Sequence, residues 1–93
     1  MVNKDDVTFD INNGLGANGE DELGEITVSY YLDKSDDYGD CYLTICDETN
    51  GEEITTLDDV CNLNGYDDAT VNDIREQIAD AVNAYLSELN SDN

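Results

Sequence analysis

Carboxylates are the groups best able to do chemistry in this 93-residue chain, which holds 24 Asp and Glu residues against 3 Lys and Arg. The formal net charge is −21 at pH 7, and there is no histidine. Two carboxylates act as catalytic acid and base only where their environments separate their pKa values, and no pair here is singled out in that way. No serine or cysteine lies in a recognisable nucleophile motif. The sequence therefore predicts a protein that is not an enzyme.

Clustered carboxylates can also bind calcium, which prefers hard oxygen ligands. The alternating acids and serine of residues 33–37 resemble the first three ligands of an EF-hand loop, but Gly39 is one position late and Thr44 stands where a bidentate Glu is required. A second partial match within residues 62–73 is also interrupted. We interpret both segments as solvated acidic turns and expect no metal or other cofactor, with a calcium-binding domain as an alternative.

The three cysteines, Cys41, Cys46 and Cys61, cannot all pair within one chain, and their spacing lacks the short pairs of a structural zinc site. Cys41 and Cys46 are five residues apart, which places them on opposite faces of a strand. We expect Cys41 to be a small core residue and all three to be reduced thiols, because free cysteine commonly behaves as a buried hydrophobe.

A period of two in hydrophobicity runs through residues 25–46 and organises the predicted fold. Apolar residues alternate with polar ones on both sides of a turn at 34–39, at Ile26, Val28, Tyr30, Leu32, Cys41, Leu43 and Ile45. This alternation predicts an antiparallel hairpin with one apolar face. Apolar residues make up 39% of the chain and fall in such periodic runs, so we expect a folded domain rather than a disordered one.

The segments around the hairpin carry weaker patterns. Alternation at residues 7–11 predicts a short N-terminal strand, and the glycines and acids of residues 13–24 predict a mobile acidic loop. The Asn50-Gly51 pair predicts a second hairpin turn, followed by a third strand at about residues 53–57. Residues 60–63 are interpreted as a short helical turn or an irregular link.

The clearest helix of the sequence is at the C-terminal side. Apolar residues three or four apart from Val71 to Leu89 form one stripe, and Asp68 or Thr70 can cap the start of the helix. Residues 90–93 are expected to fray. Burying the apolar sides of helix and strands together predicts one α+β domain over residues 1–93, an antiparallel sheet of three or four strands packed by one C-terminal helix.

The chain shows no secretory pattern at its start and no apolar stretch near the roughly 20 residues that a membrane span needs. We therefore expect a soluble cytoplasmic protein. A surface this negative repels anionic lipid and nucleic acid, so we expect no membrane binding and no direct binding of nucleic acid. Net repulsion between copies predicts a monomer.

The acids are dispersed at nearly every turn and along one side of the helix at Asp73, Glu76 and Asp80. Residues two apart on a strand are roughly 6 to 7 Å apart, and residues four apart on a helix about 6 Å. Successive phosphates of a nucleic-acid strand advance about 3.4 Å on the axis and lie at a similar through-space spacing. A rigid domain with carboxylates at these intervals can present what a DNA-binding groove accepts.

In size, charge and inferred build, the whole chain resembles the small acidic DNA-mimic proteins of phages and mobile elements, which include many anti-CRISPR proteins, anti-restriction proteins and the uracil-DNA glycosylase inhibitor. The resemblance implies stoichiometric occupation of a basic groove in a host defence protein and transfers no residue-level site. The expected partner is a basic nucleic-acid-binding protein, a Cas effector first and a restriction enzyme next. If the protein is phage-encoded, its location is the host bacterial cytoplasm.

We place the partner-binding surface at the acidic turns 33–40 and 47–53, because they combine dense charge with tyrosines that can anchor an interface. Residues 58–59 and 67–68 form a second cluster. The predicted partner-binding residues are Asp33, Asp36, Asp37, Tyr38, Asp40, Tyr42, Asp47, Glu48, Glu52, Glu53, Asp58, Asp59, Asp67 and Asp68. The main alternative is a haloadapted or generic acidic interaction module, which the three cysteines and six tyrosines fit less well.

Overall fold

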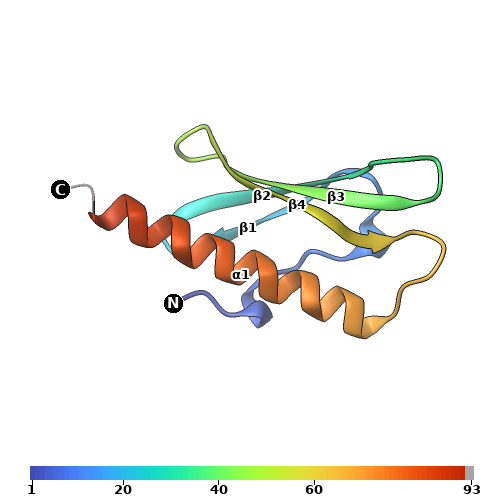
Figure 1. Ribbon diagram of the computed structural model, residues 1–93. Helices are drawn as coiled ribbons and strands as arrows, with labels where there is room; N and C mark the ends of the chain where they lie inside the picture. Colours follow the sequence, from blue (N-terminus) through green and yellow to red (C-terminus); the bar gives the residue numbers. More distant parts are fainter. Residues whose placement is uncertain (92–93) are drawn as a thin grey trace.

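The fold is one antiparallel sheet packed by one long helix, and the computed structural model describes residues 1–91 (Figure 1). The strands lie in the order β1-β2-β3-β4, with bounds β1 (Gly16–Leu23), β2 (Ile26–Lys34), β3 (Asp40–Asp47) and β4 (Glu52–Asn62). The other elements are α1 (Asp68–Ser91) and two short 3-10 helices, η1 (Lys4–Asp6) and η2 (Ile11–Asn13). The predicted α+β class, with a C-terminal helix on an antiparallel sheet, is confirmed.

The central hairpin of β2 and β3 has the register that the period of two predicts. Tyr30 lies opposite Ile45, and Leu32 lies opposite Leu43, and all four side chains are fully buried. Side chains alternate between the two faces of a strand, so a single register places every apolar member of the hairpin on one side. That side faces α1.

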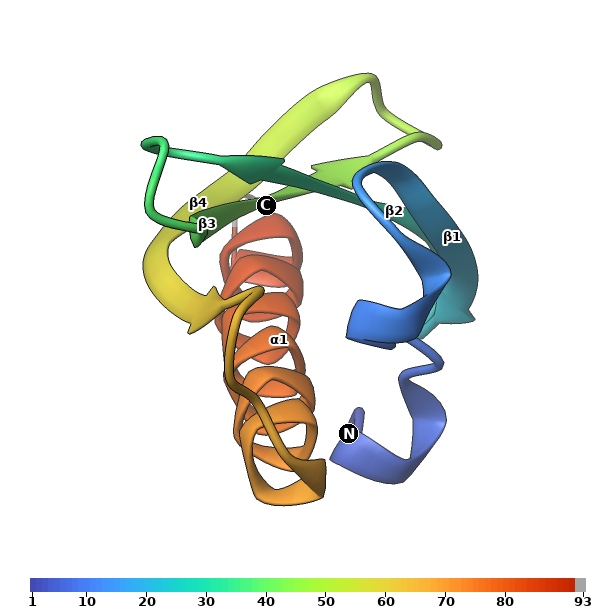
Figure 2. The same cartoon turned by 90° about the vertical axis from the view of Figure 1, so that its right-hand side faces the viewer.

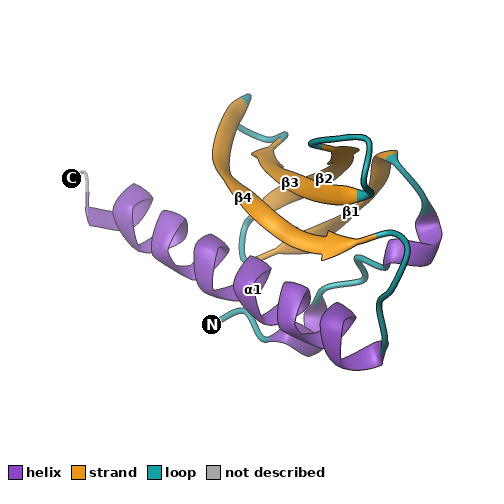
Figure 3. Cartoon of the chain, turned by 45° about the vertical axis from the view of Figure 1, so that its right-hand side comes forward, coloured by secondary structure: helices purple, strands orange, loops and turns teal. Residues whose placement is uncertain are grey.

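The inner face of the sheet is covered by α1 and by the N-terminal segment, which lie next to each other beneath the curved sheet (Figure 2). The buried helix positions are Val71, Ile74, Ile78, Ala79 and Val82. Phe9 of the N-terminal segment meets Tyr30 edge to face, with ring centroids 6.0 Å apart. No helix lies over the outer face in the part of the chain that the structure describes (Figures 2 and 3).

The predicted strand at residues 7–11 is wrong, although its apolar residues are buried as expected. Val7, Phe9 and Ile11 belong to the core, but the segment is irregular and then turns into η2. Its backbone is held by side chains of β1 rather than by a ladder, because Thr8 N donates to Asp21 at 2.8 Å. Alternation in so short a segment therefore reports burial and not strand pairing.

The predicted mobile loop at residues 13–24 is also wrong, because most of it is the edge strand β1, paired with β2. A bulge between Ala17 and Glu20 interrupts the pairing, and Gly19 adopts a φ of 106° there. Asn18 is buried at the bulge, and its Nδ2 donates to the carbonyls of Asp10 at 3.1 Å and Gly14 at 2.8 Å. The glycines allow a bulged strand here.

The third predicted strand is longer than expected, since β4 includes Val60 and Cys61, for which the sequence predicts a helical turn or an irregular link. The start of the helix also differs. Asp67 is its N-terminal cap, because Oδ1 of Asp67 accepts from both N and Oγ1 of Thr70 at 2.9 Å. Of the tail predicted to fray, Asn90 and Ser91 continue α1, and residues 92–93 lie outside the described residues.

The β1–β2 turn predicts a test of the packing between sheet and helix. Gly24 has a φ of +64°, and a Cβ there would lie 2.7 Å from Cδ1 of Leu86. Gly24→Ala is therefore expected to lower the free energy of unfolding by about 2 kcal/mol, from backbone strain and displacement of Leu86. Urea unfolding measures it. The control is Gly51→Ala, whose φ of +71° is similar but whose Cβ would meet nothing within 4 Å. Equal losses in both variants would show that the Leu86 contact contributes nothing.

Candidate acidic interface

The structure separates the predicted binding residues into two groups at opposite ends of the sheet. In an antiparallel meander, successive turns lie at opposite ends, so the β2–β3 turn and the β3–β4 turn cannot form one surface (Figure 1). We call the larger group the tyrosine end: Asp33, Asp36, Asp37, Tyr38, Asp40, Tyr42, Asp58, Asp59, Asp67 and Asp68. We call the smaller group the glutamate end: Asp47, Glu48, Glu52 and Glu53.

At the tyrosine end, the β2–β3 turn is fixed by hydrogen bonds that leave one aromatic ring in solvent. Oδ1 of Asp36 accepts from the backbone N of Tyr38 at 2.9 Å and of Asp40 at 3.2 Å. The carbonyl of Tyr38 accepts from Nδ2 of Asn62 at 3.1 Å and of Asn64 at 2.9 Å. The Tyr38 side chain is nevertheless 79% exposed. The turn thus presents an aromatic ring on a backbone held from both sides.

Gly39 allows Asn62 and Asn64 to lie close to the backbone of the β2–β3 turn. Its φ is +95°, and a Cβ would lie 2.8 Å from Nδ2 of Asn64 and 3.0 Å from Oδ1 of Asn62. Leu63 N also donates to the Gly39 carbonyl at 2.9 Å. The residues after β4 are therefore packed directly onto the turn, which explains why acids 20 residues apart in sequence share one end of the molecule.

Two carboxyls at this end are held in the ionised form. Desolvation would raise the pKa of Asp36, but hydrogen bonds from Tyr38 and Asp40 outweigh it and place the pKa below its ordinary value. The backbone N–H and the hydroxyl of Thr70 likewise lower the pKa of Asp67. Both groups therefore carry full negative charge at neutral pH.

Acids of β2 and β4 also lie on either side of Tyr42 of β3. Asp33 lies opposite Tyr42, and the bulged residues Asp58 and Asp59 face Tyr42 from β4, because Leu43 pairs with Leu57 and Cys41 with Cys61. Asp59 has a φ of 50°. The bulge inserts extra residues into β4, so it brings two acids to a position where a regular strand would place one residue.

The glutamate end contains one residue that is not available to a partner. Asp47 is only 1% exposed, and its carboxylate accepts four hydrogen bonds, from N of Thr49, from N and Nδ2 of Asn50, and from the hydroxyl of Tyr85. Its role is to join the β3–β4 turn to α1. Glu48 turns over the outer face, where it accepts hydrogen bonds from the hydroxyls of Ser29 and Tyr31.

The sequence interpretation missed two acids of the outer face, Glu20 and Glu22. They belong to β1 and lie opposite Ser29 and Thr27, the two residues that are hydrogen-bonded to Glu48. The alternation of these two acids along the sequence was the available signal for a strand. The inward side of β1 is not uniformly apolar, however, because it includes Asp21, whose carboxylate accepts from the hydroxyl of Tyr30 at 2.7 Å. With a polar residue on its inner side, β1 lacks the apolar alternation by which a strand is predicted. The outer face therefore carries acids on all four strands.

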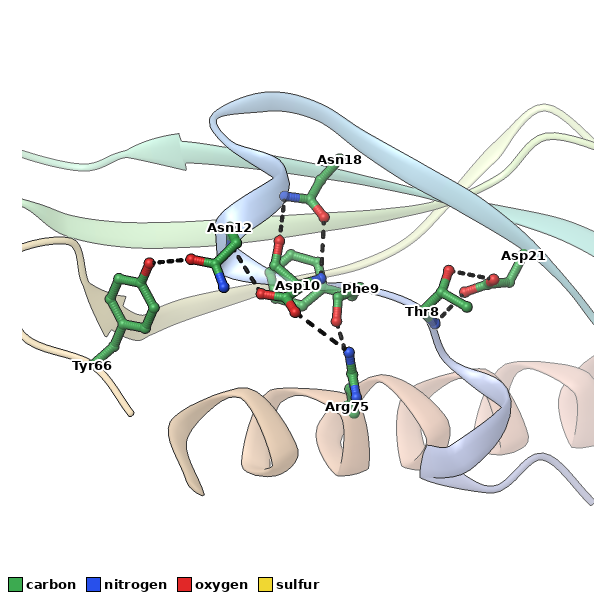
Figure 4. A network of polar contacts seen from close by, with 8 residues as sticks. All are labelled: Thr8, Phe9, Asp10, Asn12, Asn18, Asp21, Tyr66 and Arg75. Carbon is green, nitrogen blue, oxygen red and sulfur yellow. Dashed lines mark hydrogen bonds and ion pairs between the residues drawn. The ribbon is translucent and has the colours of Figure 1, made fainter. Parts of the chain in front are cut away.

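Almost none of this charge is neutralised by cations. Within residues 1–91 the structure contains one ion pair, Arg75 to Asp10 at 3.8 Å (Figure 4). Nε of Arg75 also donates to the carbonyl of Phe9 at 2.8 Å, so this arginine holds the N-terminal segment against α1. It lies on the inner side, away from the outer-face acids.

Comparisons with protein-family models, curated proteins and solved structures found no match to the chain. Among the described residues, no group of three or more Cys, Asp or Glu side chains is placed to hold a metal ion. Of the suspected calcium ligands in residues 33–37, Oδ1 of Asp33 accepts from the backbone N of Lys34 at 2.9 Å, and Oγ of Ser35 donates to the carbonyl of Asp40 at 3.1 Å. No helix of residues 1–91 is long and apolar enough to cross a membrane.

Proposed function

We propose that the protein is a DNA-mimic inhibitor that binds the basic nucleic-acid-binding groove of another protein and blocks DNA binding. The observation that supports it most directly is the outer surface, where acids from all four strands and the turns stand on a rigid frame whose strands contain one cation, Lys34. Such a charge destabilises the folded state by self-repulsion, so a function other than stability accounts for its retention.

The spacing of these acids supports the same proposal. Neighbouring strands are about 4.8 Å apart, and residues on one face of a strand recur at roughly 7 Å. Duplex DNA carries phosphates at about 3.4 Å of axial advance per strand. The sheet therefore offers negative charge at a density of the same order, in a fixed arrangement. A fixed arrangement lowers the entropy lost on binding.

The tyrosine end is the best candidate for the centre of the contact. Tyr38 is exposed and Tyr42 half-buried among acids, and aromatic rings in such positions can stack on the arginines of a basic groove. The proposed target is a bacterial defence protein, a Cas effector first and a restriction enzyme next, on the basis of the compositional resemblance. A groove surface that binds the tyrosine end would not also contact the glutamate end, because the two ends are separated by the length of the sheet (Figure 1).

The direct test is competition for DNA. Binding of a labelled duplex by a Cas effector complex and by a restriction endonuclease is measured with increasing amounts of the purified protein at about 50 mM salt. We expect one of them to lose DNA binding at a near-equimolar ratio, with potency decreasing as salt increases, because the contact is electrostatic. The same protein, immobilised, should also retain a basic nucleic-acid-binding protein at low salt. If it retains none, the proposal is contradicted.

A melting series separates this function from the alternatives. We expect the protein to be folded at about 0.15 M NaCl and to gain stability as salt screens its self-repulsion, with equal effects of NaCl and KCl. At matched ionic strength, CaCl₂ should add no further stabilisation. A haloadapted protein would require molar salt to fold. A calcium-binding domain would gain a large additional increase in Tm from millimolar CaCl₂, because a ligand bound only by the folded state stabilises it.

A further inference from the structure

Two of the three cysteines face each other across neighbouring strands. Cys41 of β3 lies directly opposite Cys61 of β4, and Cys41 is fully buried while Cys61 is half-buried. Residues directly opposite in an antiparallel ladder have Cα atoms about 4.5 to 5.5 Å apart. A disulfide needs a Cα separation of about 4.4 to 6.8 Å. The backbone therefore holds the two thiols within the range of a covalent bond.

We propose that Cys41 and Cys61 form a dithiol site that a small-molecule disulfide, such as glutathione disulfide, converts into an intrachain disulfide. The Cys61 thiolate attacks one sulfur of the oxidant and releases one glutathione thiolate, which gives a mixed disulfide. The Cys41 thiolate then attacks the Cys61 sulfur and releases the second glutathione thiolate. The protein loses two protons and two electrons, and the oxidant is reduced to two glutathione thiols.

The position of the two cysteines in the ladder sets the distance that this disulfide would span. Leu63 N donates to the carbonyl of Gly39, and one further step of the register beyond Asp40 and Asn62 places these two residues opposite each other, as a hydrogen-bonded pair. Pairs alternate along an antiparallel ladder, so Cys41 and Cys61 also form a hydrogen-bonded pair, the type with the wider Cα separation of about 5.5 Å. This separation is within the commonest range for disulfides, so the bond can form without movement of the backbone.

The surroundings make the site slow to react at neutral pH. Burial, followed by interaction with Cys41, raises the pKa of the Cys61 thiol to about 11. Burial also raises the pKa of Cys41. Since the thiolate is the nucleophile, oxidation should accelerate steadily as the pH is raised above 7. The partly exposed Cys61 is the thiol that the oxidant reaches first.

Cys46 provides an internal control. It lies on the outer side of β3 opposite Glu53, so no thiol faces it. Burial and the nearby Glu48 and Glu53 raise its pKa, which gives it the same slow chemistry without a partner. Cys46 can therefore acquire a glutathionyl group but cannot exchange it for an intrachain bond.

The experiment exposes the whole protein to glutathione disulfide at about pH 8.5, alkylates the remaining thiols and maps the peptides by mass spectrometry. We expect a peptide pair linked through Cys41 and Cys61, lacking two hydrogen atoms and restored by dithiothreitol, and a Tm about 5 °C higher in the oxidised form. Cys46→Ser should retain the linkage, and Cys61→Ser should abolish it. Alkylatable Cys41 and Cys61 under conditions that modify Cys46, or a glutathionyl group that persists on Cys61 of the wild-type protein, would overturn the proposal. Both outcomes are read from the wild-type protein and do not depend on the folding of a variant.

Discussion

Replacing Asp36, Asp37 and Asp40 together by asparagine is expected to weaken inhibition of the partner's DNA binding about 100-fold. Each change removes one charge from the tyrosine end, and a charge pair at the rim of an interface contributes about 1 kcal/mol. Three such losses correspond to roughly two factors of ten, since 1.4 kcal/mol is about tenfold in affinity. The measurement is the concentration of protein that halves DNA binding by the target.

Asparagine is the appropriate replacement because it keeps the turn intact. Its Oδ1 can still accept from the backbone N–H groups that Asp36 binds, and at position 40 from Nδ2 of Asn62, which donates to Asp40 at 2.9 Å. The thermal midpoint should therefore change by only a few degrees. Lower repulsion offsets the loss of charge-assisted hydrogen bonds.

The matched control removes three charges from the back of α1. Asp73, Glu76 and Asp80 are all exposed, so their replacement by Asn, Gln and Asn changes the net charge by the same amount at a different place. We expect less than a threefold change in inhibition, arising from weaker long-range steering. If the helix triple abolishes inhibition and the turn triple does not, the binding surface lies on α1 and our placement is wrong.

The parts of the fold that the sequence predicted are those with long, unbroken periodicity. The central hairpin satisfies a period of two over two strands, and α1 satisfies a helical period from Val71 to Val82, so each had one register in which its apolar side is buried. The sequence did not predict β1, because its inward side contains Asp21. The hydroxyls that donate hydrogen bonds to the Asp21 carboxylate belong to Thr8 and Tyr30, which are not its sequence neighbours. The sequence of a strand whose inward side holds a hydrogen-bonded polar residue therefore resembles that of a loop.

In the candidate site, too, local features were predictable from the sequence and features that depend on long-range contacts were not. That the acids concentrate in turns was visible in the sequence, but which turns lie together depends on strand order and register. The β4 bulge that brings Asp58 and Asp59 to the tyrosine end depends on the pairing of Cys41 with Cys61. The burial of Asp47 depends on Tyr85, 38 residues away. Both effects arise from long-range contacts, which local patterns do not specify.

Asp47→Ala is expected to lower the free energy of unfolding by about 3 kcal/mol, with a thermal midpoint lower by about 15 °C. The carboxylate accepts hydrogen bonds from two backbone N–H groups and two side chains, with distances of 2.6 Å to both Nδ2 of Asn50 and the hydroxyl of Tyr85. Its removal leaves these donors without their acceptor and separates the β3–β4 turn from α1. Urea and thermal unfolding measure the loss.

Glu52→Ala is the control for Asp47. Glu52 is exposed and its carboxylate is 3.5 Å from the Tyr85 hydroxyl, at the limit of a hydrogen bond, so we expect a change within about 0.5 kcal/mol. A double-mutant cycle of Asp47→Ala with Tyr85→Phe should give a coupling energy of about 1 to 2 kcal/mol, as expected for a hydrogen bond to a charged group. Equal losses for Glu52 and Asp47 would show that the turn is held by something other than this network.

The charge of Asp47 should also be visible in the pH dependence of stability. Burial alone would raise its pKa, but hydrogen bonds from Tyr85, Asn50 and Thr49 outweigh burial and lower the pKa below the ordinary value. A carboxyl whose pKa is lowered by folding stabilises the protein fully above its unfolded pKa of about 3.9, and this contribution is lost as the pH falls through the folded value. Comparison of the wild type with Asp47→Asn isolates this group, because the relief of self-repulsion by acid is common to both proteins. We expect the difference in unfolding free energy to be constant from about pH 7 to 5 and to narrow below about pH 4. A difference that stays constant down to about pH 2.5 would mean that the network stabilises the shape of this side chain and not its charge.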